Sequence, residues 1–426
     1  MLDRKTPPVV CDFESISLVP PKPSWLRNGI VIKEFDNPNL DLIHFSVVIR
    51  AGALYEPLRR ISSTCYALLR ESHKIMTSNE IDAFFDYYGA DVNISTGMNF
   101  VTLKALMPKR NCLKILPFLA DLLIEPDFKE DNLSRLLEKK IKDWEYQSKK
   151  TDNRVTQLLF HTFYDGLIPF GKLLERADFD VITLKSIADY HRETCCAENI
   201  RIFVCGNVDQ EIRDCIRHAF ERVPSHRPAP ELPEGSRFFH PQRIVENWPQ
   251  SLQTSIMLCR PSLPYTAPET LDFRFMQTLF CNYFGSRLMQ NLREKNGYTY
   301  GIGGSVAYCG KDSIFYISSE VNNDKADVAI EACFDEMMRL QTEKPSDEEM
   351  VMVRNYMLGS ALRSIDGTVS YMLNYSQWDD FGKDENWFYQ YLSAIKKMSA
   401  QQVCELAVKY LQPDAFTVIE VGKLVD

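Results

Sequence analysis

Residues 284–301 read Phe-Gly-Ser-Arg-Leu-Met-Gln-Asn-Leu-Arg-Glu-Lys-Asn-Gly-Tyr-Thr-Tyr-Gly. Within this stretch, Gly297 can adopt the left-handed conformation that ends a helix at Asn296. The chain then turns into a strand. Arg293 therefore lies on the last helical turn and Tyr300 on the strand, so we expect their side chains to converge on one face of the protein.

This pair has a chemistry of its own. The guanidinium of Arg293 offers fixed donors to a peptide carbonyl, and the phenol of Tyr300 can donate to the oxyanion that forms when a peptide bond becomes tetrahedral. A purely structural alternative remains open at this point. Arg293 would then interact with the helix dipole, and Tyr300 would pack beside Tyr298.

Outward from this stretch, the order of elements repeats. The segments 199–209 and 414–424 are both β-branched strands closed by a glycine, and each follows a long helical block. This repetition predicts two homologous α+β domains, because strands lie early and helices late in each half. The expected divisions are an N-terminal extension (1–24), a first domain (25–222), a linker containing several prolines (223–249) and a second domain (250–426).

Helical periodicity is clearest in a few places. It predicts long helices over about 129–164 and 268–296. A shorter helix over 77–88 has Thr77 or Ser78 as its cap, and Gly89 ends it.

Composition excludes several function classes. The 426 residues include 49 Lys+Arg against 58 Asp+Glu, a formal net charge of −9, which argues against nucleic acid as a partner. No apolar run approaches the roughly 20 residues that span a bilayer, so we expect no membrane insertion. The first residues do not resemble a signal peptide. We expect a cytoplasmic protein, and a periplasmic origin with the signal removed stays open.

Twelve cysteines are present, but no Cys-x-x-Cys pair occurs. Most lie in apolar surroundings, which is typical of buried free thiols in a reducing compartment. No cysteine has a neighbouring histidine of the kind that activates a nucleophile, so a thiol hydrolase is disfavoured.

The eighteen-residue stretch resembles the second-domain signature of the pitrilysin/insulinase/mitochondrial processing peptidase superfamily, the inverzincin metallopeptidases. The shared features are Gly285-Ser-Arg-Leu, Leu292-Arg-Glu-Lys-x-Gly and a tyrosine seven residues after the arginine. The element order extends the resemblance over nearly the whole chain. It implies two αβ-roll domains, each an antiparallel-rich sheet covered by helices, which together form half of a clam-shell chamber. It also implies that Arg293 and Tyr300 are the catalytic residues of this chain.

One part of the family pattern is missing. Active members carry His-x-x-Glu-His on the first helix of the first domain, with a distal glutamate that completes the zinc site. Aligned on the resemblance, Ser63, Tyr66 and Ala67 occupy these three positions, and the distal position falls near Lys139 and Lys140. Because these residues are poor zinc ligands or none, we expect no metal and no other cofactor in this chain.

The resemblance suggests how such a chain could still act. The superfamily includes pairs in which one subunit carries zinc and the other, as in bacterial Arg/Tyr subunits, does not. We therefore expect a zinc-bearing homologous subunit as partner, or a homodimer, with activity in proteolysis only in the assembled peptidase. A catalytically inactive scaffold or peptide-binding protein is the alternative.

The resemblance also points to a peptide-binding strand. Asp91-Val-Asn-Ile-Ser resembles the edge strand on which family members bind an extended peptide substrate, which would give Asp91, Asn93 and Ser95 a role in substrate binding. The alternative is an ordinary strand of the sheet.

Overall fold

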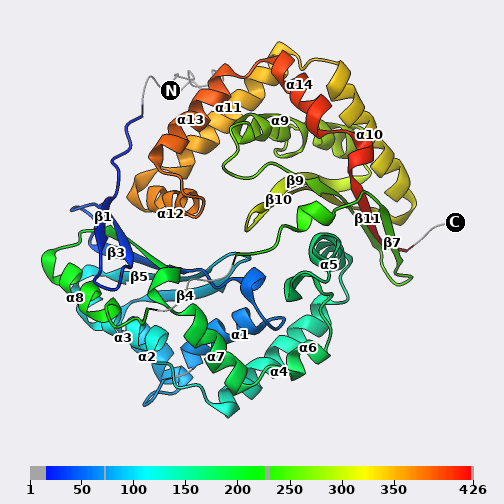
Figure 1. The fold of residues 1–426 in the computed structure, drawn as a ribbon. Coiled ribbons are helices and arrows are strands. Elements are labelled where there is room, and N and C mark those ends of the chain that lie inside the picture. The colour runs from blue at the N-terminus through cyan, green and yellow to red at the C-terminus, as the bar shows by residue number, and fades with distance from the viewer. Residues whose placement is uncertain (1–15, 72, 226–230, 424–426) are drawn as a thin grey trace, which may run out of the picture.

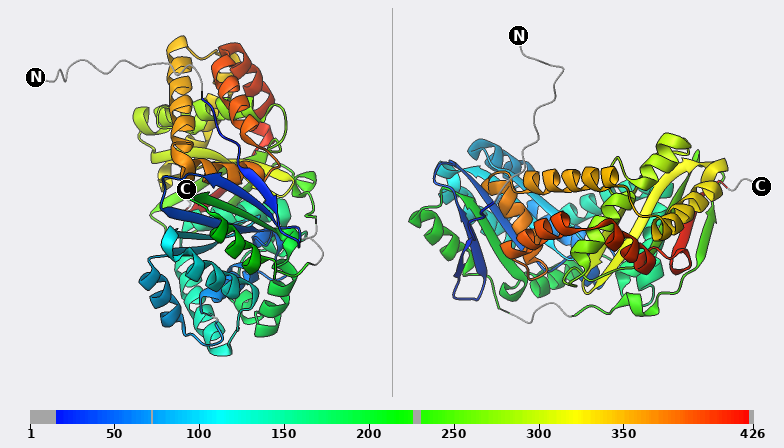
Figure 2. Two further views of the ribbon diagram at one scale, coloured as in Figure 1. Left: turned by 90° about the vertical axis from the view of Figure 1, so that its left-hand side faces the viewer. Right: turned by 90° about the horizontal axis from the view of Figure 1, so that it is seen from above.

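The computed structural model describes residues 16–71, 73–225 and 231–423. Figure 1 shows the two halves of the chain arranged as an open ring, with the first sheet in the lower half and the second sheet in the upper half. Seen from above in Figure 2, helices of the second half reach across towards the first sheet.

The first half holds a six-stranded sheet and its covering helices. Its strands are β1 (Lys22–Trp25), β2 (Val31–Asp36), β3 (Leu42–Ile49), β4 (Asp91–Thr96), β5 (Val101–Pro108) and β6 (Ile200–Gly206). Its helices are α1 (Ile61–Leu68), α2 (Ser78–Tyr88), α3 (Cys112–Ile124), α4 (Glu130–Gln147), α5 (Thr151–Tyr164), α6 (Ala177–Asp180), α7 (Leu184–Thr194) and α8 (Gln210–Phe220).

The second half holds a five-stranded sheet. Its strands are β7 (Arg243–Asn247), β8 (Gln253–Pro261), β9 (Thr299–Cys309), β10 (Asp312–Asn322) and β11 (Thr417–Gly422). Its helices are α9 (Thr270–Cys281), a π-helix (Met289–Lys295), α10 (Ala326–Thr342), α11 (Asp347–Ser364), α12 (Gly367–Asp379), α13 (Glu385–Lys397) and α14 (Ala400–Tyr410).

The two sheets share one strand order. The first sheet runs β1-β2-β6-β3-β5-β4, and the second runs β7-β11-β8-β10-β9. When β1 is left out, each strand of the first sheet has a counterpart in the second. Among the described strands, each sheet also has a single parallel pair, which is β2 with β6 in the first sheet and β7 with β11 in the second. The predicted α+β class with two similar, antiparallel-rich domains is confirmed.

The strand equivalence corrects the expected linker. Strand β7 lies inside 223–249, where it matches β2 and pairs with β11, so it belongs to the second sheet. Its side chains alternate between exposed and half-buried, and a short strand with so little buried surface leaves a weak apolar pattern. Strand β1 likewise begins inside 1–24, with all four residues exposed.

Both long predicted helices are interrupted. The helix expected over 129–164 breaks between Gln147 and Thr151, and the one expected over 268–296 breaks after Cys281. The prediction for the shorter helix is confirmed. Thr77 caps α2 through a capping box with Glu80, and Gly89 ends the helix at φ +67°.

Helix α12 joins the two halves. Phe35 of β2 meets the rings of Tyr371 and Tyr375 edge-on, with centroids 5.2 and 5.4 Å apart. Arg201 of β6 binds Asp379 at the end of the same helix. The first sheet therefore packs against a helix of the second half, and this contact positions the surfaces described below.

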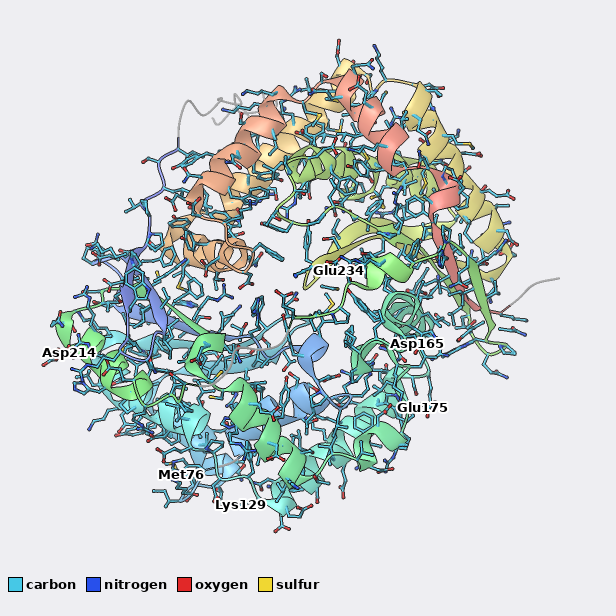
Figure 3. The ribbon with its side chains drawn as sticks, in the orientation of Figure 1. Met76, Lys129, Asp165, Glu175, Asp214 and Glu234 are labelled. Atoms are coloured by element: carbon cyan, nitrogen blue, oxygen red, sulfur yellow. The ribbon has the colours of Figure 1, made fainter. Side chains whose placement is uncertain are left out.

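The connection between the halves passes close to the second sheet. Figure 3 shows Glu234 near the β9–β10 hairpin, whereas Asp165 lies after α5. The next residue, Gly235, donates its backbone N–H to Asp312 Oδ2 at 2.6 Å, and Tyr164 donates to the same oxygen at 2.9 Å. Asp312 thus ties the end of α5 and the connecting segment to the hairpin. Among the described residues, no helix is both long and apolar enough to span a membrane.

Candidate functional site

Arg293 lies on the π-helix, and Tyr300 lies at the start of β9. Gly297 has φ +63°, as predicted, and its N–H bonds Arg293 O at 3.1 Å. The helix therefore ends at Asn296, and the next residues lead directly into the strand. A π-helix is rare and is frequently found at functional sites.

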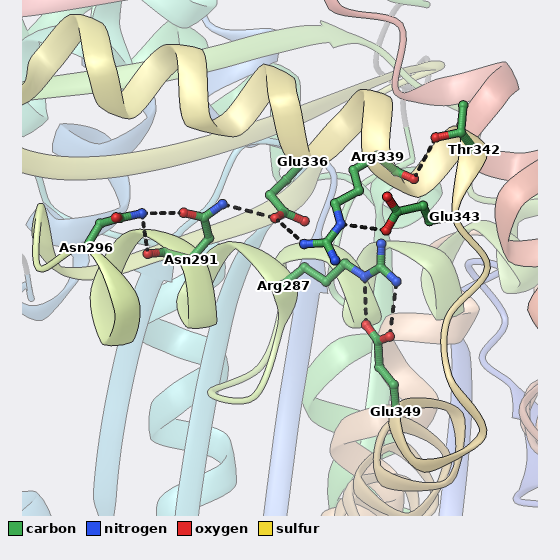
Figure 4. A network of polar contacts seen from close by, with 8 residues as sticks. All are labelled: Arg287, Asn291, Asn296, Glu336, Arg339, Thr342, Glu343 and Glu349. Atoms are coloured by element: carbon green, nitrogen blue, oxygen red, sulfur yellow. Dashed lines mark hydrogen bonds and ion pairs between the residues drawn. The ribbon is translucent and has the colours of Figure 1, made fainter.

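Side chains from two neighbouring helices hold this segment (Figure 4). Asn291 donates to Glu336 of α10 at 3.0 Å and accepts from Asn296 at 2.6 Å. Arg287 makes two bonds to Glu349 of α11, at 2.7 and 3.1 Å. Because these contacts lie on both sides of Arg293, they restrict where the π-helix can place its guanidinium.

Arg293 is half-buried and stacks on an aromatic ring. Its Cζ lies 4.7 Å from the centroid of Phe284, and its Nε is 3.6 Å from Glu294 Oε1. This stacking leaves guanidinium donors available. The expected convergence of Arg293 with Tyr300 stays a prediction.

Tyr300 projects from a β-bulge. Thr299 pairs with Val321 and Ile302 with Ser319, so Tyr300 and Gly301 together oppose the single residue Glu320. Bulges redirect side chains and occur often beside active sites. The Tyr300 side chain is 90% exposed, which contradicts the alternative in which it packs against Tyr298. Its phenol is open to a ligand.

The positions of the missing zinc motif lie on α1. Tyr66 is fully buried, with its hydroxyl 2.9 Å from Thr194 Oγ1, and Ala67 has no donor atom. Ser63 Oγ accepts a hydrogen bond from Lys140 Nζ at 3.3 Å. A lysine of α4 therefore contacts α1 at Ser63, and the assignment of these residues to the family's metal position stays a prediction.

Charged side chains lie around this contact, and we call Glu56, Arg59, Arg60 and Lys140, together with Ser63, the α1 cluster. Burial raises the pKa of Glu56 to about 7, although Arg59 Nη1 lies 3.5 Å from its Oε1. Burial, together with the charge of Arg60, lowers the pKa of Lys140 to about 8. Both shifts favour the neutral forms.

The α1 cluster does not suit a metal ion. Among the described residues, no three His, Cys, Asp or Glu side chains come close enough to hold one. The cationic ends of Lys140 and Arg59 would repel a zinc ion. The residues present therefore do not fit the zinc site of an active family member.

Strand β4 is an edge of the first sheet, as predicted. It pairs with β5 alone among the described strands, and Asp91, Asn93 and Ser95 have exposed side chains. The carbonyl of Val92 accepts a hydrogen bond from Arg70 Nη1 at 2.8 Å. In a strand, the backbone N–H and C=O of one residue point the same way. The N–H and C=O groups of Val92, Ile94 and Thr96 therefore point away from β5.

Sequence reasoning missed the contact between Arg70 and the edge strand. Arg70 and Val92 are 22 positions apart, and they meet because the turn that carries Arg70 follows α1, which packs against β4. The bond occupies one outward-facing carbonyl and leaves the groups of Ile94 and Thr96 for another chain.

These features define a two-domain α+β protein with two sheets of the same strand order and an exposed tyrosine beside a π-helix. The family model described as Insulinase (Peptidase family M16) matches residues 35–168. The model described as Peptidase M16 inactive domain matches residues 182–357.

Two curated relatives match most of the chain. An uncharacterized zinc protease of Rickettsia felis is 25% identical over 350 residues, covering 80% of this chain and 82% of the relative. A protein of the same description from Rickettsia bellii is 23% identical over 389 residues, covering 87% and 88%.

Solved structures share the fold. A peptidase M16 inactive domain from Pseudomonas fluorescens aligns with a TM-score of 0.85 and 17% identity, covering 96% of this chain and 98% of that one. A protease from Helicobacter pylori aligns with a TM-score of 0.86 and 16% identity, covering 95% and 100%. The chain belongs to the pitrilysin/insulinase superfamily.

Proposed function

We propose that this protein is the non-zinc subunit of a heterodimeric zinc metallo-endopeptidase. In this proposal it binds no catalytic zinc and is inactive alone. Arg293 binds a carbonyl of the substrate, and Tyr300 donates to the developing oxyanion. The zinc and its general base come from a homologous partner subunit, with which this chain completes a clam-shell chamber.

The observation that carries the proposal is the contrast between the two halves. In the first half, Ser63 and Lys140 contact each other where the resemblance puts the family's metal. In the second half, Tyr300 is exposed on a bulged strand next to a π-helix. A phenol that is 90% exposed has little packing value, so a chemical role explains it better than a structural one.

Strand β4 supplies a place for the substrate. The outward main-chain groups of Ile94 and Thr96 can pair with an extended peptide, and such pairing tolerates many side chains. Asp91, Asn93 and Ser95 would then contact the peptide through their exposed side chains.

The alternative function is a catalytically inactive scaffold or peptide-binding protein of the same fold. The degenerate metal position favours it, because the residues there cannot hydrolyse a peptide through zinc. The open phenol of Tyr300 and the unpaired edge of β4 favour the peptidase subunit.

Reconstitution separates the two functions. The chain is expressed alone and with a homologous subunit that carries His-x-x-Glu-His, and the cleavage of a quenched fluorescent peptide and the zinc content are measured. We expect cleavage only from the pair, with zinc in the partner. Cleavage or stoichiometric zinc in this chain alone would contradict the proposal.

The role of Tyr300 is tested in the reconstituted pair. Removing an oxyanion donor costs about 10²–10³ in kcat, so Tyr300→Phe should lower kcat by that factor and leave KM nearly unchanged. Tyr298→Phe, two residues away and half-buried, is the matched control. An unchanged kcat for Tyr300→Phe would exclude the oxyanion role.

We also propose a reducing compartment, such as the cytoplasm. Leaving Cys196 aside, ten cysteines of the described chain are free thiols, and all of these except Cys215 are buried. Disulfides are the rule for exposed cysteine pairs in oxidising compartments, so this usage fits a reducing one.

A further inference from the structure

A cavity of about 300 Å³ lies in the second half, between α9, α12 and α13. Its walls are mostly aromatic, with Tyr265, Tyr308, Phe381 and Trp387 among them, and Arg274 of α9 contributes a guanidinium. This volume is at the small end of the range for ligand sites, so it suits one amino-acid side chain with its neighbouring polar group.

Tyr265 is fixed at the centre of these walls. Its ring stacks on Phe381 with centroids 4.1 Å apart and an interplanar angle of 11°. Its hydroxyl accepts a hydrogen bond from Trp387 Nε1 at 3.0 Å, and Tyr308 meets its ring edge-on at 5.0 Å. The cavity is therefore formed by rings that hold one another in place.

Arg274 has aromatic neighbours but no acidic partner. Its Cζ lies 4.7 Å from the centroid of Tyr265, and its Nη2 is 3.5 Å from Tyr308 Oη, a weak contact. Within the described parts of the chain, no carboxylate forms an ion pair with it. A guanidinium has five donors, so most of its capacity for hydrogen bonds is unused by side chains.

The carboxylates next to the cavity are already paired. Asp380, which lines it, binds Arg201 Nη2 at 2.5 Å, and Asp379 binds both Arg201 and Lys33. Two cations from the first sheet thus neutralise two aspartates from the end of α12. The guanidinium of Arg274 lies over the rings of Tyr265 and Tyr308 and keeps its positive charge, so it can still pair with an anion that enters the cavity.

We propose that this cavity binds a carboxylate of a peptide next to a large apolar side chain. The carboxylate would pair with the planar guanidinium of Arg274, for which two parallel hydrogen bonds are the favoured geometry. The apolar side chain would fill the aromatic walls. No zinc-bearing partner is required for this binding, so the inference goes beyond the proposed function.

A second, smaller hollow continues the site towards the first half. Its volume is about 150 Å³, and it shares Asp380 and Phe381 with the cavity. Asn99 and Phe100 line it from the loop that follows β4, and Asn99 Nδ2 bonds Tyr308 O at 2.7 Å. The hollow therefore links the end of the proposed peptide-binding strand with the carboxylate cavity.

The test measures binding by the full chain alone, using fluorescence anisotropy and three labelled probes. The first is fluorescein-Gly-Ser-Gly-Ala-Phe with a free C-terminal carboxylate, and the second is the same peptide as a C-terminal amide. The third is fluorescein-Gly-Ser-Gly-Glu-Phe amide, in which the carboxylate belongs to a side chain. Binding of the first probe alone identifies a C-terminal carboxylate as the ligand, and binding of the third identifies an acidic side chain.

The matched variants are Arg274→Gln and Arg260→Gln. Arg260 also lies over an aromatic ring, at 5.7 Å from Phe416, but its guanidinium donates to backbone carbonyls and does not line the cavity. Because a charged hydrogen-bond pair is lost, Arg274→Gln should lower the affinity for the carboxylate probe about tenfold or more. Arg260→Gln should leave that affinity unchanged. The affinity of Arg274→Lys for the carboxylate probe should lie between those of wild type and Arg274→Gln. This variant keeps the test informative if the glutamine variant is unstable.

Three results would overturn the inference. They are no binding of any probe, binding of the amide of the first peptide as tightly as both carboxylate-bearing probes, and equal affinity of wild type and a folded Arg274→Gln variant for the carboxylate probe that binds. Because this measurement involves no cleavage, its failure is distinct from a failure of the proposed peptidase function.

Discussion

Replacing Lys140 by methionine should make the protein more stable at pH 7. Burial holds the pKa of Lys140 at about 8 instead of 10.5, and this difference corresponds to about 3 kcal/mol. The folded state bears that cost whenever the lysine is charged. Methionine has a similar length and no charge, and it loses only the 3.3 Å bond to Ser63, worth about 1 kcal/mol. The expected net gain in the free energy of unfolding is about 2 kcal/mol.

The pH dependence gives a second, sharper readout. Between pH 8 and 10.5 the unfolded chain binds more protons at this lysine than the folded chain does, so the stability of wild type rises with pH in that window. Lys140→Met removes this rise, and the two proteins should converge in stability as the pH approaches 10.

The assay is urea unfolding followed by circular dichroism at pH 7, 8, 9 and 10. Lys139→Met is the control, since this neighbouring lysine is exposed and its replacement should change stability by less than about 0.5 kcal/mol. The reasoning fails if Lys140→Met destabilises the protein at pH 7, or if its stability rises between pH 8 and 10 as steeply as that of wild type.

Three further changes test other parts of the structure. Because the pKa of buried Glu56 is raised to about 7, wild type should lose stability as pH rises from 4.5 to 7, and Glu56→Gln should reduce that loss by about 2 kcal/mol in the same urea series. Arg201→Met leaves half-buried Asp380 without its cation, although Asp379 keeps Lys33, and should cost about 3 kcal/mol, seen as a lower Tm. Gly304→Ala places a methyl group against Cys281 Sγ and should cost about 1–3 kcal/mol, whereas Gly303→Ala, with 3.8 Å to the nearest atom, should stay close to wild type in Tm.

The sequence predicted the class of fold because local signals agreed with the topology. Closing strands β6 and β11 are apolar, β-branched and ended by glycine, and both are almost fully buried. The edge position of β4 was also predicted, from its likeness to a family strand. The caps Thr77 and Gly89 act within one turn of a helix, so a short window of sequence was enough to find them.

The missed features depend on contacts between distant residues. Strand β7 has only half-buried side chains on its inner face. Its residues pair with residues of β11 that lie 175 positions further along the chain, as Arg243 does with Val418. The helix expected through residue 296 stops after Cys281 because the chain turns there, with Ser286 N–H bonded to Tyr283 O at 3.0 Å. Periodicity alone does not reveal such a turn when apolar residues continue beyond it.

The functional site divides in the same way, between features that a short stretch of sequence indicates and features that are built from distant residues. Aligning residues onto a family pattern predicted a degenerate metal position at Ser63, Tyr66 and Ala67, which stays a prediction, and the structure adds the contact of Lys140 with Ser63. The carboxylate cavity could not be found that way, since Arg274, Phe381 and Trp387 come from three separate elements. An arginine within an amphipathic helix has no sequence signal that shows whether an acidic partner faces it.

The α1 cluster provides a physical test between the two functions. A chain that served only as a scaffold would gain stability from apolar residues at a buried charged position, yet Glu56 and Lys140 both remain ionisable there with pKa values moved towards their neutral forms. Functional sites are where such costs are tolerated. If Lys140→Met stabilises the chain and also lowers peptide cleavage by the reconstituted pair, the cluster contributes to handling the substrate. If it stabilises the chain and leaves cleavage and peptide binding unchanged, the cluster has no such role, and the function of the chain must reside in Arg293, Tyr300 and the edge strand.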